Sequence, residues 1–173
     1  ISVSDKKDEI WNGLDISKKE ADIILMTGGL GPTNDDITKH AIAEYFNQEL
    51  MVNAEALERI QRFFQVRKVK ISDRNREQAL LPEKCRPVPN EFGTAMGMWF
   101  EKDHKHYIVM PGVPYEMKAM MTGHIIPDLK KQFRLPVIFH RTVHTTGIPE
   151  SVMADKISGW ESNLSPHIKL AYL

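Results

Sequence analysis

Two neighbouring carboxylates follow a glycine-rich segment in the stretch TGGLGPTNDD, which ends at Asp36. Gly28, Gly29 and Gly31 would let the backbone turn tightly and approach a ligand with no side chain in the way. Backbone N–H groups at the start of a helix attract anions such as phosphate. Asp36, and less directly Asp35, could hold a Mg²⁺ ion that neutralises phosphate oxygens. The stretch therefore predicts a site for a phosphate group and a divalent cation.

A simpler interpretation of the same residues requires no ligand. Thr33 and Asp36 fit the Thr-x-x-Asp form of a capping box, and Asn34 and Asp35 could also cap the helix that follows. The pattern is neither G-x-G-x-x-G nor a P-loop, because no Lys-Ser or Lys-Thr follows the glycines. We therefore expect no lysine-dependent nucleotide site here.

The elements on either side of this turn would place it at the edge of a sheet. Residues 7–20 have the pattern of an amphipathic helix, and the apolar run 21–26 is typical of a buried strand. Apolar residues then recur at helical spacing over 37–46. In an open α/β sheet, ligands bind where a parallel strand ends and a helix begins. The glycine turn would occupy such a place.

The middle of the chain predicts two further helices and a pair of strands. Residues 57–64 carry a helical apolar face, and Ser72 is a possible N-cap for the helix after it. Prolines at 82, 87 and 89 would keep the next passage extended. The runs 94–100 and 106–110 then predict two strands. His104 and His106 lie between or beside them, and a solvated turn is favoured over a metal site because no third donor is near.

The last third predicts a helix, a change of domain and a second helix. The segment after Gly112 should be helical through a set of core methionines and should bend before Pro127. Residues 134–147 resemble a strand, and Pro149 would open a helix carrying Met153, Ile157 and Trp160. We expect a domain boundary near residues 135–140.

Composition limits the possible partners and the cellular setting. Lysine plus arginine and aspartate plus glutamate number 23 each, so no overall charge would attract nucleic acid or an anionic membrane. No apolar run approaches the ~20 residues that cross a bilayer. Cys85 is the only cysteine, which excludes an internal disulfide. We expect a soluble, cytoplasmic protein, in which Cys85 is a poor candidate nucleophile and no leader sequence is visible.

Five motifs together resemble a known family. TGGLGPTNDDIT, NREQALLPE, PNEFGTAMG, VMPGVPYEMKAM and RTVHTTGIPES occur in the order found in the CinA (competence/damage-inducible) proteins, within their molybdopterin-binding-like domain, which is related to MoaB and MogA. The resemblance implies an α/β fold with a mostly parallel sheet flanked by helices over residues 1–138. Residues 139–173 would begin a small α/β second domain.

The resemblance also implies a reaction. In CinA proteins this domain is associated with metal-dependent pyrophosphatase action on ADP-ribose or a related dinucleotide. Asp36 matches an aspartate that contacts magnesium and phosphate, and Asp5 matches an earlier aspartate that follows a strand. We expect both to be catalytic and to bind the metal, although Asp5 could equally be a helix N-cap. A homo-oligomer, such as a dimer, is expected from the resemblance alone.

The remaining site residues form three walls around a small-molecule nucleotide. Asn90 could hydrogen-bond the ligand, Gly93 and Gly112 would allow close approach, and Glu116 could either bind substrate or stabilise the first turn of a helix. The residues expected to bind substrate are Thr27, Gly28, Gly29, Gly31, Thr33, Asp35, Thr38, Asn90, Gly93, Thr94, Gly112 and Glu116.

Departures from the family pattern leave two alternatives open. Met96 stands where family members usually have proline, and the family's opening strand with its GDE and DTN segments does not precede Ile1. The C-terminal domain with nicotinamide mononucleotide deamidase activity is also absent, so that reaction is not assigned. A domain that binds or adenylylates a pterin, and a non-catalytic nucleotide-binding module, remain the alternative functions.

Overall fold

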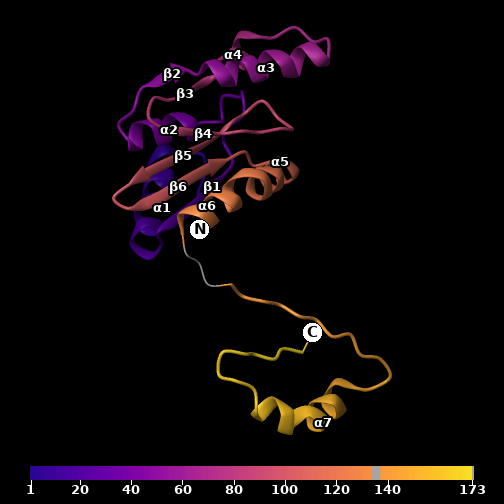
Figure 1. Ribbon diagram of the computed structural model, residues 1–173. Helices are drawn as coiled ribbons and strands as arrows, with labels where there is room; N and C mark the ends of the chain where they lie inside the picture. Colours follow the sequence, from indigo (N-terminus) through magenta and orange to yellow (C-terminus); the bar gives the residue numbers. More distant parts are fainter. Residues whose placement is uncertain (134–136, 173) are drawn as a thin grey trace. The chain divides into compact units, whose positions relative to one another are not determined.

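The computed structural model describes residues 1–133 and 137–172 (Figure 1). In the first part of the chain, helices pack around a sheet. The chain divides into two compact units, Ile1–Arg134 and Leu135–Leu173. The elements of the first unit are α1 (Lys7–Glu20), β1 (Ile23–Thr27), α2 (Thr38–Tyr45), β2 (Leu50–Val52), α3 (Ala54–Val66), α4 (Asp73–Glu77), β3 (Leu80–Pro82), β4 (Arg86–Val88), β5 (Gly97–Lys102), β6 (Lys105–Met110), α5 (Pro114–Met120), a π-helical turn η1 (Met121–Ile125) and α6 (Ile126–Gln132).

The main sheet has the strand order β1-β6-β5-β4. β1 pairs with β6 in parallel, whereas β5 pairs with both β6 and β4 in antiparallel fashion. The α/β class with a sheet flanked by helices is confirmed, but the sheet is mixed rather than mostly parallel. The reason is local, because only Asp103 and His104 connect β5 to β6, and their φ angles of 52° and 60° make a tight hairpin turn.

Both histidines near this turn are part of the hairpin itself. His104 lies in the turn, as the sequence favours. His106 lies in β6, where its Nδ1 accepts a hydrogen bond of 3.1 Å from Trp99 Nε1. A metal-binding role is therefore not needed to account for either residue.

A second, two-stranded sheet joins β2 to β3 and was not anticipated from the sequence. Leu50 is paired with Pro82 in this antiparallel ladder, which brings the segment after α2 beside the segment after α4. Ser72 caps α4 as expected, in a capping box with Asn75. α4 is only five residues long, and β3 begins three residues after its end.

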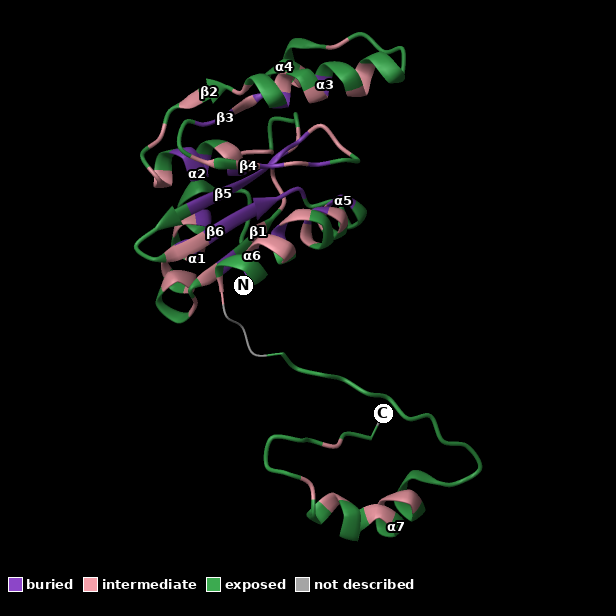
Figure 2. Ribbon diagram, viewed as in Figure 1, coloured by how far each residue is buried: buried purple, intermediate pink, exposed green. Residues whose placement is uncertain are grey.

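The sheet separates two apolar clusters because successive residues of a strand face opposite sides. In β5, Met98 and Phe100 pack in one cluster, with α1, α2 and α3, while Trp99 packs in the other. The second cluster is covered by α5, η1 and α6 through Met120 and Ile125. Figure 2 shows buried residues concentrated along β5 and β6.

The helix that carries the methionines does not break at Pro127. Proline lacks the N–H that an α-helix needs, and the chain adapts through the π-helical turn Met121–Ile125 before α6 continues. Met120 is fully buried, and Met117 and Met121 pack against the same cluster. The prediction that these methionines belong to the core is confirmed, and a π-helical turn occupies the place before Pro127 where a bend was expected.

The second unit contains the helix α7 (Glu150–Ser162), which begins directly after Pro149 as expected. The predicted strand over residues 134–147 is wrong for 137–147, which have no regular structure; residues 134–136 lie outside the described part of the chain. Phe139 and its apolar neighbours Val137 and Ile138 are exposed, so no sheet buries them within the described residues.

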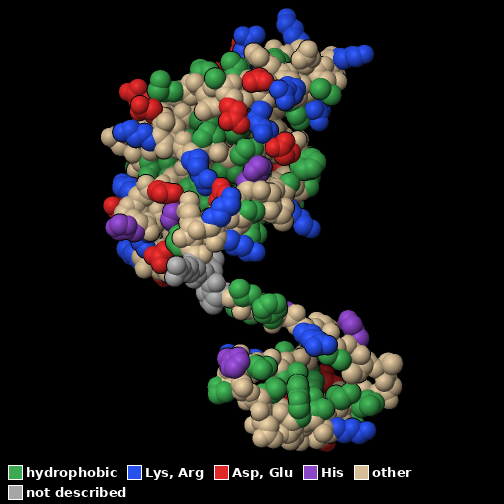
Figure 3. Space-filling model, in the orientation of Figure 1, with side chains coloured by type: hydrophobic (Ala, Val, Ile, Leu, Met, Phe, Trp, Pro, Cys, Tyr) green, Lys and Arg blue, Asp and Glu red, His purple; other side chains and the backbone are tan. Residues whose placement is uncertain are grey.

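Charge is spread evenly over the surface in view. Basic and acidic side chains are interspersed on this face of the first unit (Figure 3), in keeping with the equal totals of 23 each. Within residues 1–133 and 137–172, no helix combines the length and the apolar character needed to cross a bilayer.

Candidate functional site

The glycine turn is fixed on both sides by backbone hydrogen bonds. Gly28 N donates to Met110 O at 3.0 Å, and Thr38 N donates to Gly29 O at 3.1 Å. Gly28 and Gly29 have φ angles of 104° and 65°, which favour glycine. The Gly28 amide is therefore not free for a ligand, contrary to expectation. The N–H groups of Gly29 and Leu30 donate to no acceptor in the described part of the chain.

Asp36 closes a small loop with Thr33 instead of capping a helix. Its Oδ2 accepts hydrogen bonds from the hydroxyl and, at 2.9 Å, from the backbone N–H of Thr33. α2 begins later, at Thr38, and its N-cap residue Ile37 makes no side-chain cap. The predicted capping box is wrong because the helix starts two residues beyond Asp36.

This loop keeps the Asp36 carboxylate ionised. Burial opposes the charged form, but hydrogen bonds from the Thr33 hydroxyl and from the backbones of Thr33 and Gly31 outweigh it and hold the pKa of Asp36 below its usual value. Gly31 is needed for this close contact, since a Cβ there would lie 2.5 Å from Asp36 Oδ2. A fixed negative charge therefore stands beside the glycine turn at neutral pH.

Asn90 organises a loop instead of binding a ligand. Its Nδ2 donates to Ala95 O at 2.9 Å and to Glu116 Oε2 at 2.7 Å, and its Oδ1 accepts from the N–H groups of Phe92 and Gly93. The four hydrogen-bonding positions of a buried side chain are thus used inside the protein. The predicted ligand contact by Asn90 is corrected on this ground.

Glu116 has the simpler of the two roles expected for it, that of a carboxylate in the first turn of a helix. It lies in the first turn of α5, is 8% exposed, and its carboxylate meets the Asn90 amide. Gly93 lets this carboxylate approach, because a Cβ on Gly93 would collide with it. Glu116 therefore joins α5 to the loop 90–95, two segments that were expected to form walls around the ligand.

The predicted walls do come together at the end of the parallel strand pair. A Cβ on Gly112 would lie 3.2 Å from the Cα of Gly28, so these two turns touch. Thr94 Oγ1 donates to Gln78 Oε1 at 2.8 Å, which ties the loop 90–95 to the end of α4. Residues far apart in sequence thus surround one edge of the sheet.

The other predicted substrate residues differ in their access to a ligand. Thr38 is 5% exposed and packs on Gly29, so it supports the turn and does not offer a ligand contact. Thr27 ends β1 with an exposed side chain, and Asp35 is exposed beside the Thr33–Asp36 loop.

Asp5 lies in the bend before α1 and is exposed. Two residues join the end of α1 to the start of β1, so α1 runs back along the strand and its first turn lies toward the edge where the glycine turn begins. α1 and α2 are parallel neighbours, since Trp11 Nε1 donates to Ala41 O and Tyr45 OH donates to Asp15 Oδ1. Asp5 and Asp36 therefore each lie shortly before the first turn of one of two parallel neighbouring helices.

The carboxylates present fit magnesium better than a transition metal. Mg²⁺ needs only one or two protein carboxylates and otherwise keeps water or phosphate oxygens. Asp36 is ionised and fixed, which suits one such ligand, and Asp5 is the second candidate. No group of three or more His, Cys, Asp or Glu side chains that could hold a metal occurs in residues 1–133 and 137–172.

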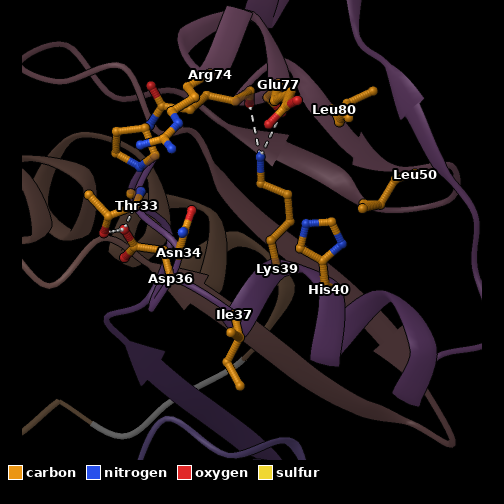
Figure 4. Close-up of a pocket in the computed structure, with 13 residues that line it drawn as sticks. Thr33, Asn34, Asp36, Ile37, Lys39, His40, Leu50, Arg74, Glu77 and Leu80 are labelled. Carbon is orange, nitrogen blue, oxygen red and sulfur yellow. Dashed lines mark hydrogen bonds between the residues drawn. The ribbon is translucent and has the colours of Figure 1, made fainter.

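A cavity of about 390 Å³ adjoins this loop, between α2, α4 and the β2–β3 pair (Figure 4). Its wall includes Thr33 and Asp36 on one side, Leu50 and Leu80 from the small sheet, and the basic residues Lys39, His40 and Arg74. This volume is within the range of small-molecule sites.

Lys39 crosses the cavity toward the end of α4. Its Nζ donates to the backbone oxygens of Glu77 at 3.1 Å and Gln78 at 3.3 Å (Figure 4). Burial, partly offset by the charge of Glu77, lowers the pKa of Lys39 to about 8. The ammonium group is thus held by neutral oxygens near the carboxyl end of a short helix.

Comparison with known proteins identifies the family. Residues 1–131 match the family described as probable molybdopterin binding domain. The chain belongs to this family. The match covers the whole of the first unit except its last few residues, including the glycine turn, the loop 90–95 and the cavity.

Relatives within the family agree with the resemblance to CinA. The chain is 42% identical over 174 residues to a CinA-like protein of Flavobacterium psychrophilum, covering 100% of this chain and 42% of that protein. It is 44% identical over 172 residues to a CinA-like protein of Cytophaga hutchinsonii, covering 99% and 41%. The chain thus spans about two fifths of the length of these curated relatives.

A solved structure supports the same family fold. The crystal structure of the protein CinA with unknown function from Thermoplasma acidophilum superposes with a TM-score of 0.61 and 31% sequence identity. The alignment covers 74% of this chain and 72% of that chain. The predicted resemblance to the CinA proteins and the α/β fold are both confirmed.

Two features of this family member were not foreseen from the sequence. Met96, the departure from the family's usual proline, is 4% exposed and packs in the core, so it does not alter a ligand-facing wall. Lys39 and Arg74 line the cavity but were not selected. For Lys39, its position three residues after Asp36 could have suggested a place in the site, whereas no sequence feature pointed to Arg74.

Proposed function

We propose that the chain hydrolyses the diphosphate of ADP-ribose or a related dinucleotide with the help of a divalent metal ion. The observation that carries this proposal is the ionised Asp36 carboxylate, fixed by Thr33 beside the glycine turn at the wall of a 390 Å³ cavity. The family description, a probable molybdopterin binding domain over residues 1–131, supports a small-molecule site in the first unit.

The chain's own residues would bind and orient the substrate. The N–H group of Gly29 donates to no acceptor among the described residues and would be the backbone donor to a phosphate oxygen. Such donors stabilise negative charge that develops on a phosphoryl group. The cavity would take one half of the dinucleotide and shield it from water.

Asp36, with Asp5 as the second candidate, would hold magnesium. When bound, magnesium neutralises the diphosphate and makes phosphorus more open to attack by water. Asp36 is well suited to this role because its pKa is already low, so no proton must leave before the ion binds. No residue is assigned as a separate general base.

The test is the variant Asp36→Asn assayed with ADP-ribose and Mg²⁺, with Asp103→Asn as the matched control, since Asp103 is exposed in the turn between β5 and β6 and is not a site residue. An asparagine at 36 still accepts a hydrogen bond from Thr33, so the loop should fold. We expect AMP and ribose phosphate from the unaltered chain, a loss of turnover of about 100-fold or more in Asp36→Asn, and little change in Asp103→Asn. EDTA should abolish turnover. Turnover in Asp36→Asn equal to that of Asp103→Asn and of the unaltered chain would remove Asp36 from the mechanism.

A second candidate is a domain that binds or adenylylates a pterin. The observation in its favour is the family itself, whose description is a probable molybdopterin binding domain. Calorimetric titration with a molybdopterin-type pterin, followed by an assay for adenylyl transfer from ATP, distinguishes this function from hydrolysis. Tight pterin binding without ADP-ribose turnover would favour it.

A third candidate is a module that binds nucleotides without reacting. Here a dinucleotide would raise the melting temperature through binding to the folded state, yet remain intact. Product analysis separates this outcome from the first proposal. The homo-oligomer and the cytoplasmic setting expected from the sequence stay predictions.

A further inference from the structure

Two basic side chains border the cavity without a carboxylate partner in residues 1–133 and 137–172. Neither Lys39 nor Arg74 takes part in any ion pair of these residues, although many surface lysines and arginines do, such as Lys18 with Asp15. The two residues come from different elements, α2 and α4. Two positive charges that form no ion pair among these residues therefore line one concave surface, together with the carboxylates of Asp36 and Glu77.

Lys39 is the more unusual of the two. It is half-buried, and charged groups that are removed from water are normally paired with an opposite charge. Its two hydrogen bonds go to backbone oxygens of Glu77 and Gln78 instead. Since an ammonium group has three donors, one is left for a guest in the cavity.

Arg74 belongs to α4, the short helix whose C-terminal end accepts the hydrogen bonds of Lys39. It is exposed, and Figure 4 shows it on the side of the cavity where Thr33 and Asn34 lie. Its guanidinium makes no hydrogen bond to the described residues of the chain. An arginine presents a rigid fork of donors that suits the oxygens of a phosphate.

The acidic groups around the cavity do not cancel these charges. The Asp36 carboxylate is already engaged by Thr33. Glu77 is exposed, and it offsets only part of the cost of burying Lys39. His40 adds a third basic side chain when it is protonated. The cavity therefore offers an anion two cations, while of its two carboxylates one is occupied by Thr33 and the other is exposed.

We propose that Lys39 and Arg74 form an anion subsite that binds a phosphoryl group inside the cavity, apart from the amides of the glycine turn. A phosphoryl group has up to three acceptor oxygens and up to two negative charges, which match one ammonium and one guanidinium group. The subsite makes this region a lysine-dependent phosphate site, which the absence of a P-loop pattern argued against. It does not require that any diphosphate be cleaved.

The size of the cavity indicates what carries the phosphoryl group. A volume of about 390 Å³ is several times that of a single phosphate and includes apolar residues Leu50 and Leu80. The phosphoryl group would then belong to a phosphomonoester with a ring, such as a nucleoside monophosphate or a sugar phosphate. Both share the same terminal chemistry, and the titrations below distinguish them.

A bound anion would also change the protonation of Lys39. The low pKa of Lys39 follows from burial, and a nearby phosphate would favour its charged form. The groups facing it are Asp36, His40, Arg74 and Glu77, of which only the two acids favour the ammonium. Occupation of the subsite should therefore raise the pKa of Lys39 in the complex.

Binding is tested by calorimetry in EDTA, so that no metal or turnover contributes. The probes are orthophosphate, ribose 5-phosphate and AMP, and the variants are Lys39→Met and Arg74→Gln. The matched controls are Lys84→Met, an exposed lysine outside the cavity, and Arg76→Gln, which lies on the same helix but does not line it. We expect each cavity variant to weaken binding by about ten-fold or more and each control to leave it within two-fold.

Each outcome bears on the proposal. Tighter binding of AMP or of ribose 5-phosphate than of orthophosphate, lost in Lys39→Met, supports the subsite and shows which molecule it takes. Equal binding of all three, also lost in Lys39→Met, supports a site for the phosphoryl group alone. Binding that is unchanged in Lys39→Met and Arg74→Gln, or undetectable in the unaltered chain at millimolar probe, overturns the proposal.

Two further measurements keep the test independent of folding and of hydrolysis. Lys39→Arg retains the charge and should bind within a few-fold of the unaltered chain, and Arg74→Gln alters an exposed residue that should not affect folding. NMR of labelled lysine should show the pKa of Lys39 rising when AMP is added, and no change would contradict a direct contact. Because hydrolysis is measured through Asp36→Asn, either proposal can fail while the other stands.

Discussion

Asp36 accepts two hydrogen bonds from Thr33, one from its hydroxyl and one from its backbone N–H at 2.9 Å. This pair closes the loop between the glycine turn and α2, and it holds a carboxylate in the charged form beside the predicted phosphate site. The geometry assigns Thr33 a task that differs from ligand binding. It positions the acid on which the proposed reaction depends.

Replacing Thr33 by valine should raise the pKa of Asp36 toward its ordinary value, because one stabilising hydrogen bond to the carboxylate is lost. Because the pKa of Asp36 is lower in the folded chain than in the unfolded chain, the Asp36 carboxylate adds to the free energy of unfolding at pH values above its ordinary pKa. This contribution is lost as the pH falls through the pKa of the folded chain. We expect the free energy of unfolding at pH 7 to fall by about 1 kcal/mol, with a smaller difference in acid. NMR titration and urea unfolding measure both, and Thr33→Ser, which keeps the hydroxyl, should behave like the unaltered chain.

Gly31→Ala should disrupt the same loop by steric overlap. The new Cβ would lie 2.5 Å from Asp36 Oδ2, so either the carboxylate or the turn must move. We expect a loss of about 1–3 kcal/mol in the free energy of unfolding and weaker hydrolysis of ADP-ribose. Gly123→Ala is the control, since a Cβ there meets no atom within 4 Å and should leave stability equal or higher. A loss in Gly123→Ala as large as in Gly31→Ala would contradict this account.

Asn90→Ala should destabilise the first unit without removing any direct ligand contact. Four hydrogen bonds disappear, and the buried Glu116 carboxylate loses the Asn90 amide. An unsatisfied buried group makes this loss larger than for an exposed asparagine, about 2–4 kcal/mol. Thermal and denaturant unfolding measure it against Asn34→Ala, an exposed site. A variant that retains full stability but loses ligand affinity would restore the original prediction that Asn90 binds substrate.

Lys39 should leave a signature in the alkaline stability of the protein. Its pKa is about 8 in the folded chain and 10.5 ordinarily. Between pH 8 and pH 10.5 the Lys39 side chain is still protonated in the unfolded chain but has lost its proton in the folded chain. The contribution of Lys39 to the free energy of unfolding therefore rises with pH over this range. The difference in unfolding free energy between the unaltered chain and Lys39→Met should therefore shift in favour of the unaltered chain from pH 8 to pH 10. Lys84→Met should show no such shift, and a flat difference for both would show that Lys39 is not desolvated.

Local sequence patterns were sufficient to predict many of the elements and the place of the turn. The apolar run 21–26, the capping Ser72 and the Pro149 helix start all correspond to elements of the structure, because their hydrogen bonds and backbone preferences are satisfied within a few residues. The glycines at 28 and 29 have the positive φ angles that their residue type suggested. The short motifs also fixed the family, since their residues keep order and spacing.

Patterns alone were less informative where distant segments compete for the same atoms. The sequence suggested that Thr33 and Asp36 cap a helix and that Asn90 faces a ligand, yet each side chain finds its partners through loop closure and burial. The β5–β6 hairpin reverses the expected strand direction because a two-residue turn suffices to connect the strands.

The amino-acid sequence by itself determined the α/β class, the glycine turn, the carboxylates near it and the family, since these depend on residue type and short spacing. Only the tertiary structure decided which polar groups are used up inside the protein and which face a cavity. The hydrogen-bonding groups of Asn90 are all used within its own loop and by Glu116, whereas Lys39 reaches the end of α4, 38 residues away, and forms no ion pair within residues 1–133 and 137–172. The physical reason is that burial and hydrogen-bond satisfaction depend on chain segments meeting in space, which spacing along the chain does not encode.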